Sequence, residues 1–109
     1  MATIEEILQM PGVAAVGVFQ PDGTVVDYKA NMDMTPEMAG MSAQFCATVS
    51  MLFATLSGSF TQLSGMQWSP PQGWMFAGGE WTVAVAGDKG VFVRSDQADY
   101  NTLYAALIG

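Results

Sequence analysis

The side chains that most often do chemistry in proteins are scarce in this sequence. It contains no histidine and a single cysteine, Cys46, so a Ser-His or Cys-His nucleophile cannot be assembled within one chain. A zinc site is excluded for the same reason, and no phosphate-binding lysine loop or dinucleotide glycine fingerprint occurs. The sequence therefore predicts no catalytic residue, no metal and no cofactor, in a protein that is not an enzyme.

Ten carboxylates remain as candidates for acid–base or cation chemistry. Asp96 and Asp99 stand where a closing helix should begin, and a cap and a first-turn dipole residue explain them better than a reactive site does. Asp27, Asp33 and Glu37 are close in sequence but lack the ligand spacing of a calcium loop. We therefore expect the carboxylates to serve structure and solubility.

Two features could still serve a ligand-binding function. Cys46 lies in a predicted helix without a basic neighbour, which favours a buried thiol over a reactive one. Four aromatic residues surround a proline-containing loop: Trp68, Trp74, Phe76 and Trp81. They could cover a sheet end and a dimer seam, recognise a protein, or line a shallow apolar pocket. A small-molecule or redox (sulfur-species) sensor that uses Cys46 and the Trp68–Trp81 region is therefore the alternative function.

Length and composition predict one small domain with surplus apolar surface. The chain has 109 residues, of which 50% are hydrophobic and 12% are charged, about half the charged fraction of an ordinary soluble domain. A domain of this size buries only roughly two-thirds of the surface that its unfolded chain exposes. We therefore expect part of its surface to meet protein rather than water.

The charge balance excludes several partners. The net charge is −7, and three cations, Lys29, Lys89 and Arg94, can neither form the basic stripe that nucleic acid requires nor hold an anionic membrane. No charge occurs between Glu37 and Glu80, but the polar residues in this stretch, and the glycines and prolines that would interrupt a helix, argue against a membrane span. Because no signal peptide is visible and one cysteine allows no internal disulfide, the expected compartment is the cytoplasm.

Helix caps and turn residues predict the element order α-β-β-α-β-β-β-α. A capping box at Thr3 and Glu6 begins a short helix that ends at Pro11-Gly12. Thr35-Pro36-Glu37 begins a long helix, which we expect to end near 57–60. Strands are predicted at 13–19, 24–28, 74–77, 81–86 and 91–94, and a closing helix capped by Asp96 extends to Ile108.

The long helix has three faces at 100° per residue. Bulky apolar residues share one face, which we expect to lie on the chain's own sheet: Met38, Met41, Phe45, Val49, Leu52, Phe53 and Leu56. A second face carries only small residues: Ala39, Gly40, Ala43, Ala47, Ser50, Ala54 and Gly58. Either it is ordinary Ala-rich surface or it lets a second copy of the helix approach closely. The third, polar face bears Gln44, Thr48 and Thr55, with Met51 beside it.

The element order and three short motifs resemble the roadblock/dynein light chain family. The motifs are the opening junction Ile7-Leu8-Gln9-Met10-Pro11-Gly12-Val13, the turn Pro21-Asp22-Gly23 and the turn Gly87-Asp88-Lys89-Gly90-Val91. The resemblance covers the whole chain, residues 1–109, as a single roadblock-like domain. The Trp- and Met-rich middle is similar to an uncharacterised bacterial or archaeal side branch.

The resemblance implies an α+β fold in which a five-stranded antiparallel sheet carries the long helix on one face and both terminal helices on the other. It also implies a homodimer through the long helix and the third strand, and a non-catalytic platform for protein partners such as small GTPases. We expect the dimer interface at Gly40, Ala43, Ala47, Ser50, Ala54, Trp74 and Phe76. We expect the partner-binding platform at Gln44, Thr48, Met51 and Thr55.

Overall fold

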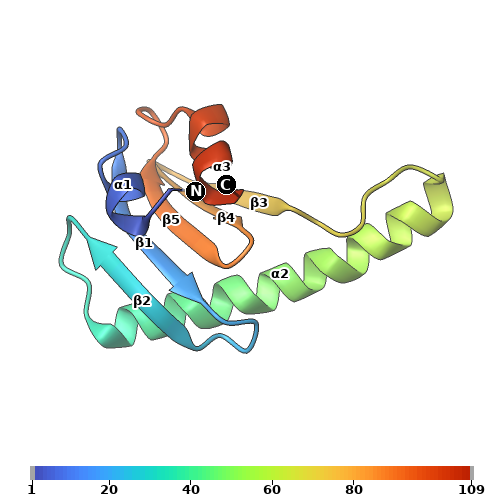
Figure 1. Ribbon diagram of the computed structural model, residues 1–109, viewed down its shortest axis with the longest axis horizontal. Coiled ribbons are helices and arrows are strands. Elements are labelled where there is room, and N and C mark those ends of the chain that lie inside the picture. Colours follow the sequence, from blue (N-terminus) through green and yellow to red (C-terminus); the bar gives the residue numbers. More distant parts are fainter. Residues whose placement is uncertain (1, 109) are drawn as a thin grey trace.

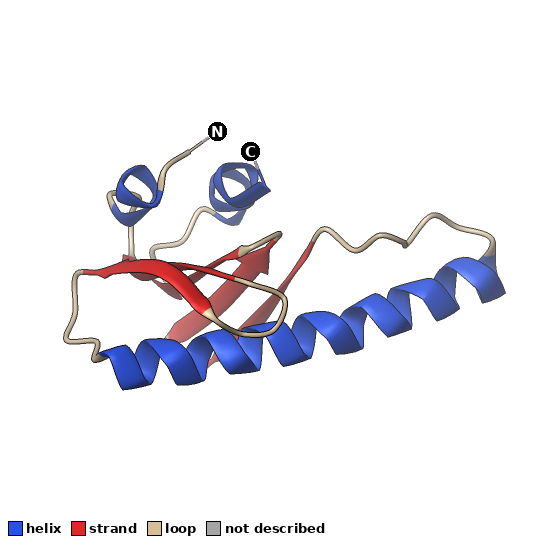
Figure 2. Cartoon of the chain, turned by 60° about the horizontal axis from the view of Figure 1, so that its bottom comes forward, coloured by secondary structure: helices blue, strands red, loops and turns tan. Residues whose placement is uncertain are grey.

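The computed structural model describes residues 2–108, which form three helices and five strands. The elements are α1 (Ile4–Leu8), β1 (Val13–Phe19), β2 (Val25–Ala30), α2 (Pro36–Ser64), β3 (Gly73–Gly78), β4 (Trp81–Ala86), β5 (Lys89–Arg94) and α3 (Tyr100–Ile108). The strands form one antiparallel sheet in the order β2-β1-β5-β4-β3. Figure 1 shows α2 reaching well beyond the sheet, and Figure 2 shows it on one face with α1 and α3 on the other. The predicted fold class and element order are confirmed.

Local side-chain chemistry fixes most of the element ends. Thr3 and Glu6 form the predicted capping box of α1, and the Thr35 hydroxyl accepts the Met38 N–H at the start of α2. Gly65 ends α2 in the left-handed conformation, at φ 74°, which glycine adopts without strain. Helix α2 is therefore longer than the predicted 57–60, because that Gly65 cap is the first effective stop.

The start of the closing helix differs from the prediction. Asp99 caps α3, because its carboxylate accepts the Thr102 N–H at 3.2 Å and its carbonyl accepts the Leu103 N–H. That hydrogen bond from the Thr102 backbone lowers the pKa of Asp99. Asp96, the predicted cap, instead lies 3.5 Å from Arg94. The chain needs several residues after β5 to turn back over the sheet, and the helix begins only after that turn.

The main core lies between the sheet and the two terminal helices. Its buried residues are Ile4, Ile7, Val13, Val16, Ala84, Ala86, Val91, Val93, Leu103 and Leu107. The one buried polar residue in this part of the described chain is Thr82, whose hydroxyl lies 2.8 Å from Ser95 Oγ and 3.1 Å from Tyr100 Oη. Since those partners satisfy the hydroxyl, its burial costs little.

On the other face of the sheet, α2 packs through its small residues. Ala39, Ala43, Cys46 and Ala47 are buried, and the last three pack with Phe19 and Val85. The bulky residues face outward: Phe45 and Leu52 are each 65% exposed. The expectation that the bulky face lies on the chain's own sheet is therefore wrong. The expectation that Ala43 and Ala47 meet a second chain is wrong for the same reason.

The sheet explains why the small face turns inward. Gly17 of β1 pairs with Gly90 of β5, and both line a cavity of about 50 Å³ beneath Ala39 and Ala43. The close contact is made beside that cavity, where Ala43, Cys46 and Ala47 pack on Phe19 and Val85. At the two glycines, the atoms nearest to an added Cβ would belong to neighbouring strands and not to α2. Bulky side chains in place of Ala43 and Ala47 would overfill the contact with Phe19 and Val85.

Helix α2 extends past the sheet that it covers. Its 29 residues span about 43 Å at 1.5 Å per residue, and buried residues occur only up to Ala47. By length and composition it is the one helix within residues 2–108 that could cross a membrane. Here its first half lies along the sheet and its second half meets the loop that returns to β3 (Figure 1).

The inward orientation of the small face can be tested by enlarging one residue. Ala47→Leu adds volume against Phe19 and Val85 and should lower the free energy of unfolding by about 1–3 kcal/mol. Ala54→Leu, the matched control, lies on the same small face beyond the sheet, where the chain is exposed, and should change stability little. Urea unfolding measures both. Equal stability of the two variants would contradict the orientation of α2.

Candidate protein interface around the long helix

The flank of α2 nearest β3 carries a continuous row of bulky residues, nearly all of them exposed. We name it the apolar flank: Met41, Phe45, Val49, Leu52, Phe53, Leu56, Phe60 and Leu63. The exposed members include Leu63 at 85%. Single exposed apolar residues are ordinary, but a contiguous row of this size marks an interaction surface.

Between the apolar flank and the sheet runs a groove of about 470 Å³. Its helix wall contains Met41, Phe45, Val49 and Phe53, and its strand wall contains Trp74, Met75, Phe76, Val83 and Phe92. No charged side chain lines it. The groove lies beside the part of the sheet that α2 covers: Val85 of β4 packs against Ala43, Cys46 and Ala47, whereas Met75 and Phe76 of β3 are exposed.

Strand β3 is an unprotected edge of the sheet. It pairs only with β4, and five of its six residues are exposed, Phe76 at 63%. Its sequence, Gly73–Gly78, contains no charge and no proline, which are the usual devices that keep an edge strand from pairing with another chain. The second edge strand, β2, carries Asp27 and Lys29.

The aromatic residues predicted around the prolines lie in different places, and two of them contact α2. The Trp74 indole donates to Ser50 Oγ at 2.8 Å and its ring lies 5.9 Å from that of Phe53, so Trp74 anchors β3 to α2. Trp68 packs on Phe60 with ring centroids 5.3 Å apart. Trp81 lies apart from them, beneath the Arg94 guanidinium at 5.4 Å. The four predicted aromatics therefore do not form one cluster.

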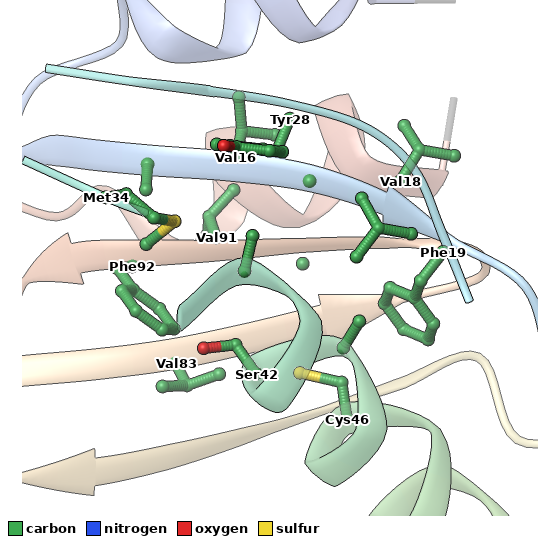
Figure 3. Close-up of a pocket in the computed structure, with 16 residues that line it drawn as sticks. Val16, Val18, Phe19, Tyr28, Met34, Ser42, Cys46, Val83, Val91 and Phe92 are labelled. Atoms are coloured by element: carbon green, nitrogen blue, oxygen red, sulfur yellow. The ribbon is translucent and has the colours of Figure 1, made fainter. Parts of the chain in front are cut away.

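Cys46 lies inside the smaller cavity beneath α2. Figure 3 shows its sulfur and the Ser42 hydroxyl on the helix side, with Phe92 and Val83 on the strand side. Cys46 is buried, and this burial raises the pKa of its thiol to about 11. Within residues 2–108 no group of three His, Cys, Asp or Glu side chains is placed to hold a metal ion. The position suits a packing residue rather than a nucleophile.

The predicted platform lies on the opposite flank of α2. Gln44, Thr48, Met51 and Thr55 are all exposed there. The Thr48 hydroxyl donates to the Gln44 carbonyl at 2.8 Å, and the Thr55 hydroxyl donates to the Met51 carbonyl at 3.3 Å. Because these hydroxyls are satisfied within the helix, each threonine presents its methyl group outward. The platform is thus less polar than its residue types indicate.

The structure separates the residues predicted for the dimer interface. Ala43 and Ala47 are buried under the sheet, Gly40 and Ser50 are half-buried, and Ala54 is exposed. Trp74 is half-buried by Ser50 and Phe53, whereas Phe76 lies open on β3. Sequence reasoning assigned most residues of the apolar flank to the core and therefore missed their exposure. The small residues of β1, Ala15 and Gly17, alternate with valines and were the signal that could have shown which helix face packs inward.

Solved structures with the same arrangement confirm the fold. The Roadblock/LC7 domain from Streptomyces avermitilis superposes with a TM-score of 0.71 at 11% identity, covering 93% of this chain and 81% of that chain. The gliding protein MglB from Thermus thermophilus gives 0.72 at 15% identity, covering 96% and 82%. Myxococcus xanthus MglB gives 0.63 at 10% identity, covering 88% and 80%.

Sequence comparison gives a family rather than a named relative. No curated protein matches the sequence. The family described as "Uncharacterized conserved protein (DUF2173)" matches residues 3–108, nearly the whole chain. The chain therefore belongs to the DUF2173 family and has the roadblock fold.

Proposed function

We propose that this chain is a non-catalytic, cytoplasmic homodimeric module that binds and regulates another protein. The observation that carries the proposal is the pairing of an exposed apolar flank with an open edge strand on one side of the chain. Helix and strand together offer the two things that a second copy needs: an apolar surface to bury and backbone groups to pair.

The absence of charge from residue 38 to residue 79 favours a second copy of the chain as the partner at this surface. Two chains of net charge −7 repel each other, and like charges in a desolvated contact are costly. The segment from 38 to 79, which contains nearly all of α2 and all of β3, has no charged residue. A self-complementary contact through α2 and β3 therefore brings no carboxylate against its own copy.

The platform on the other flank of α2 remains open in such a dimer. In a dimer through the apolar flanks, Thr48, Met51 and Thr55 of each chain lie on the flank that faces away from the seam, so each chain presents its own platform. An uncharged surface with an exposed methionine is adaptable and suits a protein partner. A small GTPase is the partner class that the roadblock resemblance implies.

A dimer through the apolar flank predicts that a charge there separates the chains. Phe45→Glu changes an exposed side chain, so the monomer should still fold. In the dimer it would bury an unpaired charge in the apolar contact between the chains, so the dimer should dissociate. Light scattering at tens of micromolar should give a dimer for the parent and a monomer for Phe45→Glu. Met51→Glu, the control on the opposite flank, should remain dimeric. A monomeric parent would contradict the proposal.

The platform predicts a different phenotype for charges on the opposite flank. Thr48→Glu and Met51→Glu should keep the fold and the dimer but lose the proteins that the parent retains from a host extract, because each places an unpaired charge in a desolvated contact. Quantitative mass spectrometry of the retained proteins measures this. If both variants retain the same proteins as the parent, the platform is not the binding site.

The alternative function, a sensor at Cys46, predicts a reactive thiol. A pKa of about 11 in place of 9.0 lowers the thiolate fraction at neutral pH about a hundredfold. We therefore expect an aromatic disulfide reagent at pH 7.5 to label Cys46 at least about tenfold more slowly in the native protein than in urea. Rapid native labelling would support the sensor instead.

The same pKa shift affects stability at high pH. The pKa of Cys46 is about 11 in the folded protein, above the value of 9.0 for an exposed thiol, so the protonated thiol favours folding below pH 9. This contribution to the free energy of unfolding disappears as the pH rises to about 11.

A further inference from the structure

A second cleft lies on the platform flank of α2 and is separate from the groove beside β3. It has a volume of about 410 Å³ and lies between the helix and the two hairpin turns that project toward it. Its lining residues are Phe19, Pro21, Ala47, Ser50, Met51, Gly87 and Asp88. The proposed dimer seam uses none of them, so the cleft stays open when two chains associate through the apolar flank.

The walls of the cleft are held in place by hydrogen bonds between the turns and the helix. The Phe19 N–H donates to the Asp88 carbonyl at 2.9 Å, which joins the end of β1 to the β4–β5 turn. The Gln44 side-chain amide donates to the Asp22 carbonyl at 3.5 Å, and the Gln44 side chain packs against Gly23. A cleft whose walls are already held in place has a smaller ordering cost on binding than a mobile one.

The cleft has one acidic lining residue, Asp88, and a second carboxylate, Asp22, follows the lining residue Pro21 on the other turn. Lys89 lies 3.5 Å from Asp88, but the lysine side chain is 15% exposed and the carboxylate 61%, so the carboxylate faces solvent. On the neighbouring turn, hydrogen bonding from the Thr24 N–H lowers the pKa of Asp22, which keeps this exposed carboxylate ionised. Met51, 64% exposed, supplies an adaptable apolar surface beside them.

We propose that this cleft docks a basic, apolar segment of the protein partner, with an apolar side chain on Met51 and Phe19 and a lysine or arginine at the Asp22 and Asp88 carboxylates. The proposal rests on the protein-binding role proposed above and specifies the chemistry of the partner. Charge complementarity supports it: all three cations of the chain already lie beside carboxylates, and within residues 2–108 none of them pairs with Asp22. An acidic or neutral apolar segment would lack this contact.

Three synthetic 14-residue amphipathic peptides test the proposal, each with the same leucine positions and with lysine, glutamine or glutamate at all polar positions. Each peptide is titrated into the isotope-labelled native protein, and binding is followed by NMR. The lysine peptide should bind tightest and should shift the signals of Phe19, Met51 and Asp88. Equal binding of all three, or shifts confined to the apolar flank, would overturn the proposal.

Variants separate docking in the cleft from general attraction to an acidic protein. Asp22→Asn with Asp88→Asn should weaken the lysine peptide about three- to tenfold, and the asparagine oxygen can still accept the Thr24 N–H. Asp33→Asn with Glu80→Gln removes the same charge elsewhere and should have a smaller effect. Met51→Gln should also weaken binding, whereas Val26→Thr, at an exposed position outside the cleft lining, should not. Equal effects of the two charge pairs would overturn the proposal.

These results are independent of the dimer. If the parent is monomeric by light scattering, the proposed function fails even where the lysine peptide binds the cleft. If the parent is dimeric but the lysine peptide does not select the cleft, only the docking proposal fails.

Discussion

The close packing of small residues between α2 and the sheet determines the rest of the molecule. Ala43, Cys46 and Ala47 pack on Phe19 and Val85, and the helix can lie against the strands there because its inward side chains are small. This contact sets the rotation of the helix about its axis. Once the small face is inward, the bulky residues must lie on one flank and the threonines on the other.

Because α2 is longer than the sheet that covers it, the residues on its outward flank form a long exposed surface. A helix of 29 residues cannot be covered by a sheet that buries it only as far as Ala47. Its distal half carries Leu52, Leu56 and Leu63 with no sheet of its own beneath them. Monomeric proteins seldom expose so much contiguous apolar area, and this supports the proposed contact of the distal half and the β3 edge with a second chain.

Sequence reasoning predicted the order of elements but not the direction in which the long helix faces. Caps and turns are local features, so Thr3, Thr35 and Pro21-Asp22-Gly23 could be recognised from neighbouring residues alone. Which stripe of a helix packs inward depends on the shape of a distant surface. Transfer free energy favours the bulky stripe as the core, yet Phe19 and Val85 already fill the sheet face on which α2 lies, so the small stripe packs there. Asp96 and Asp99 differ for a similar reason, because the path of the chain after β5 decides which of them caps α3.

The central claim is that the apolar flank, and not the small face, meets a second copy of the chain. The most direct test is isotope-filtered NMR on a mixture of labelled and unlabelled protein, which detects contacts between chains alone. The account predicts intermolecular contacts from the methyl groups of Met41, Leu52 and Met75 and none from Ala43 or Ala47. Intermolecular contacts from Ala43 and Ala47, or the absence of any contact between chains, would contradict it.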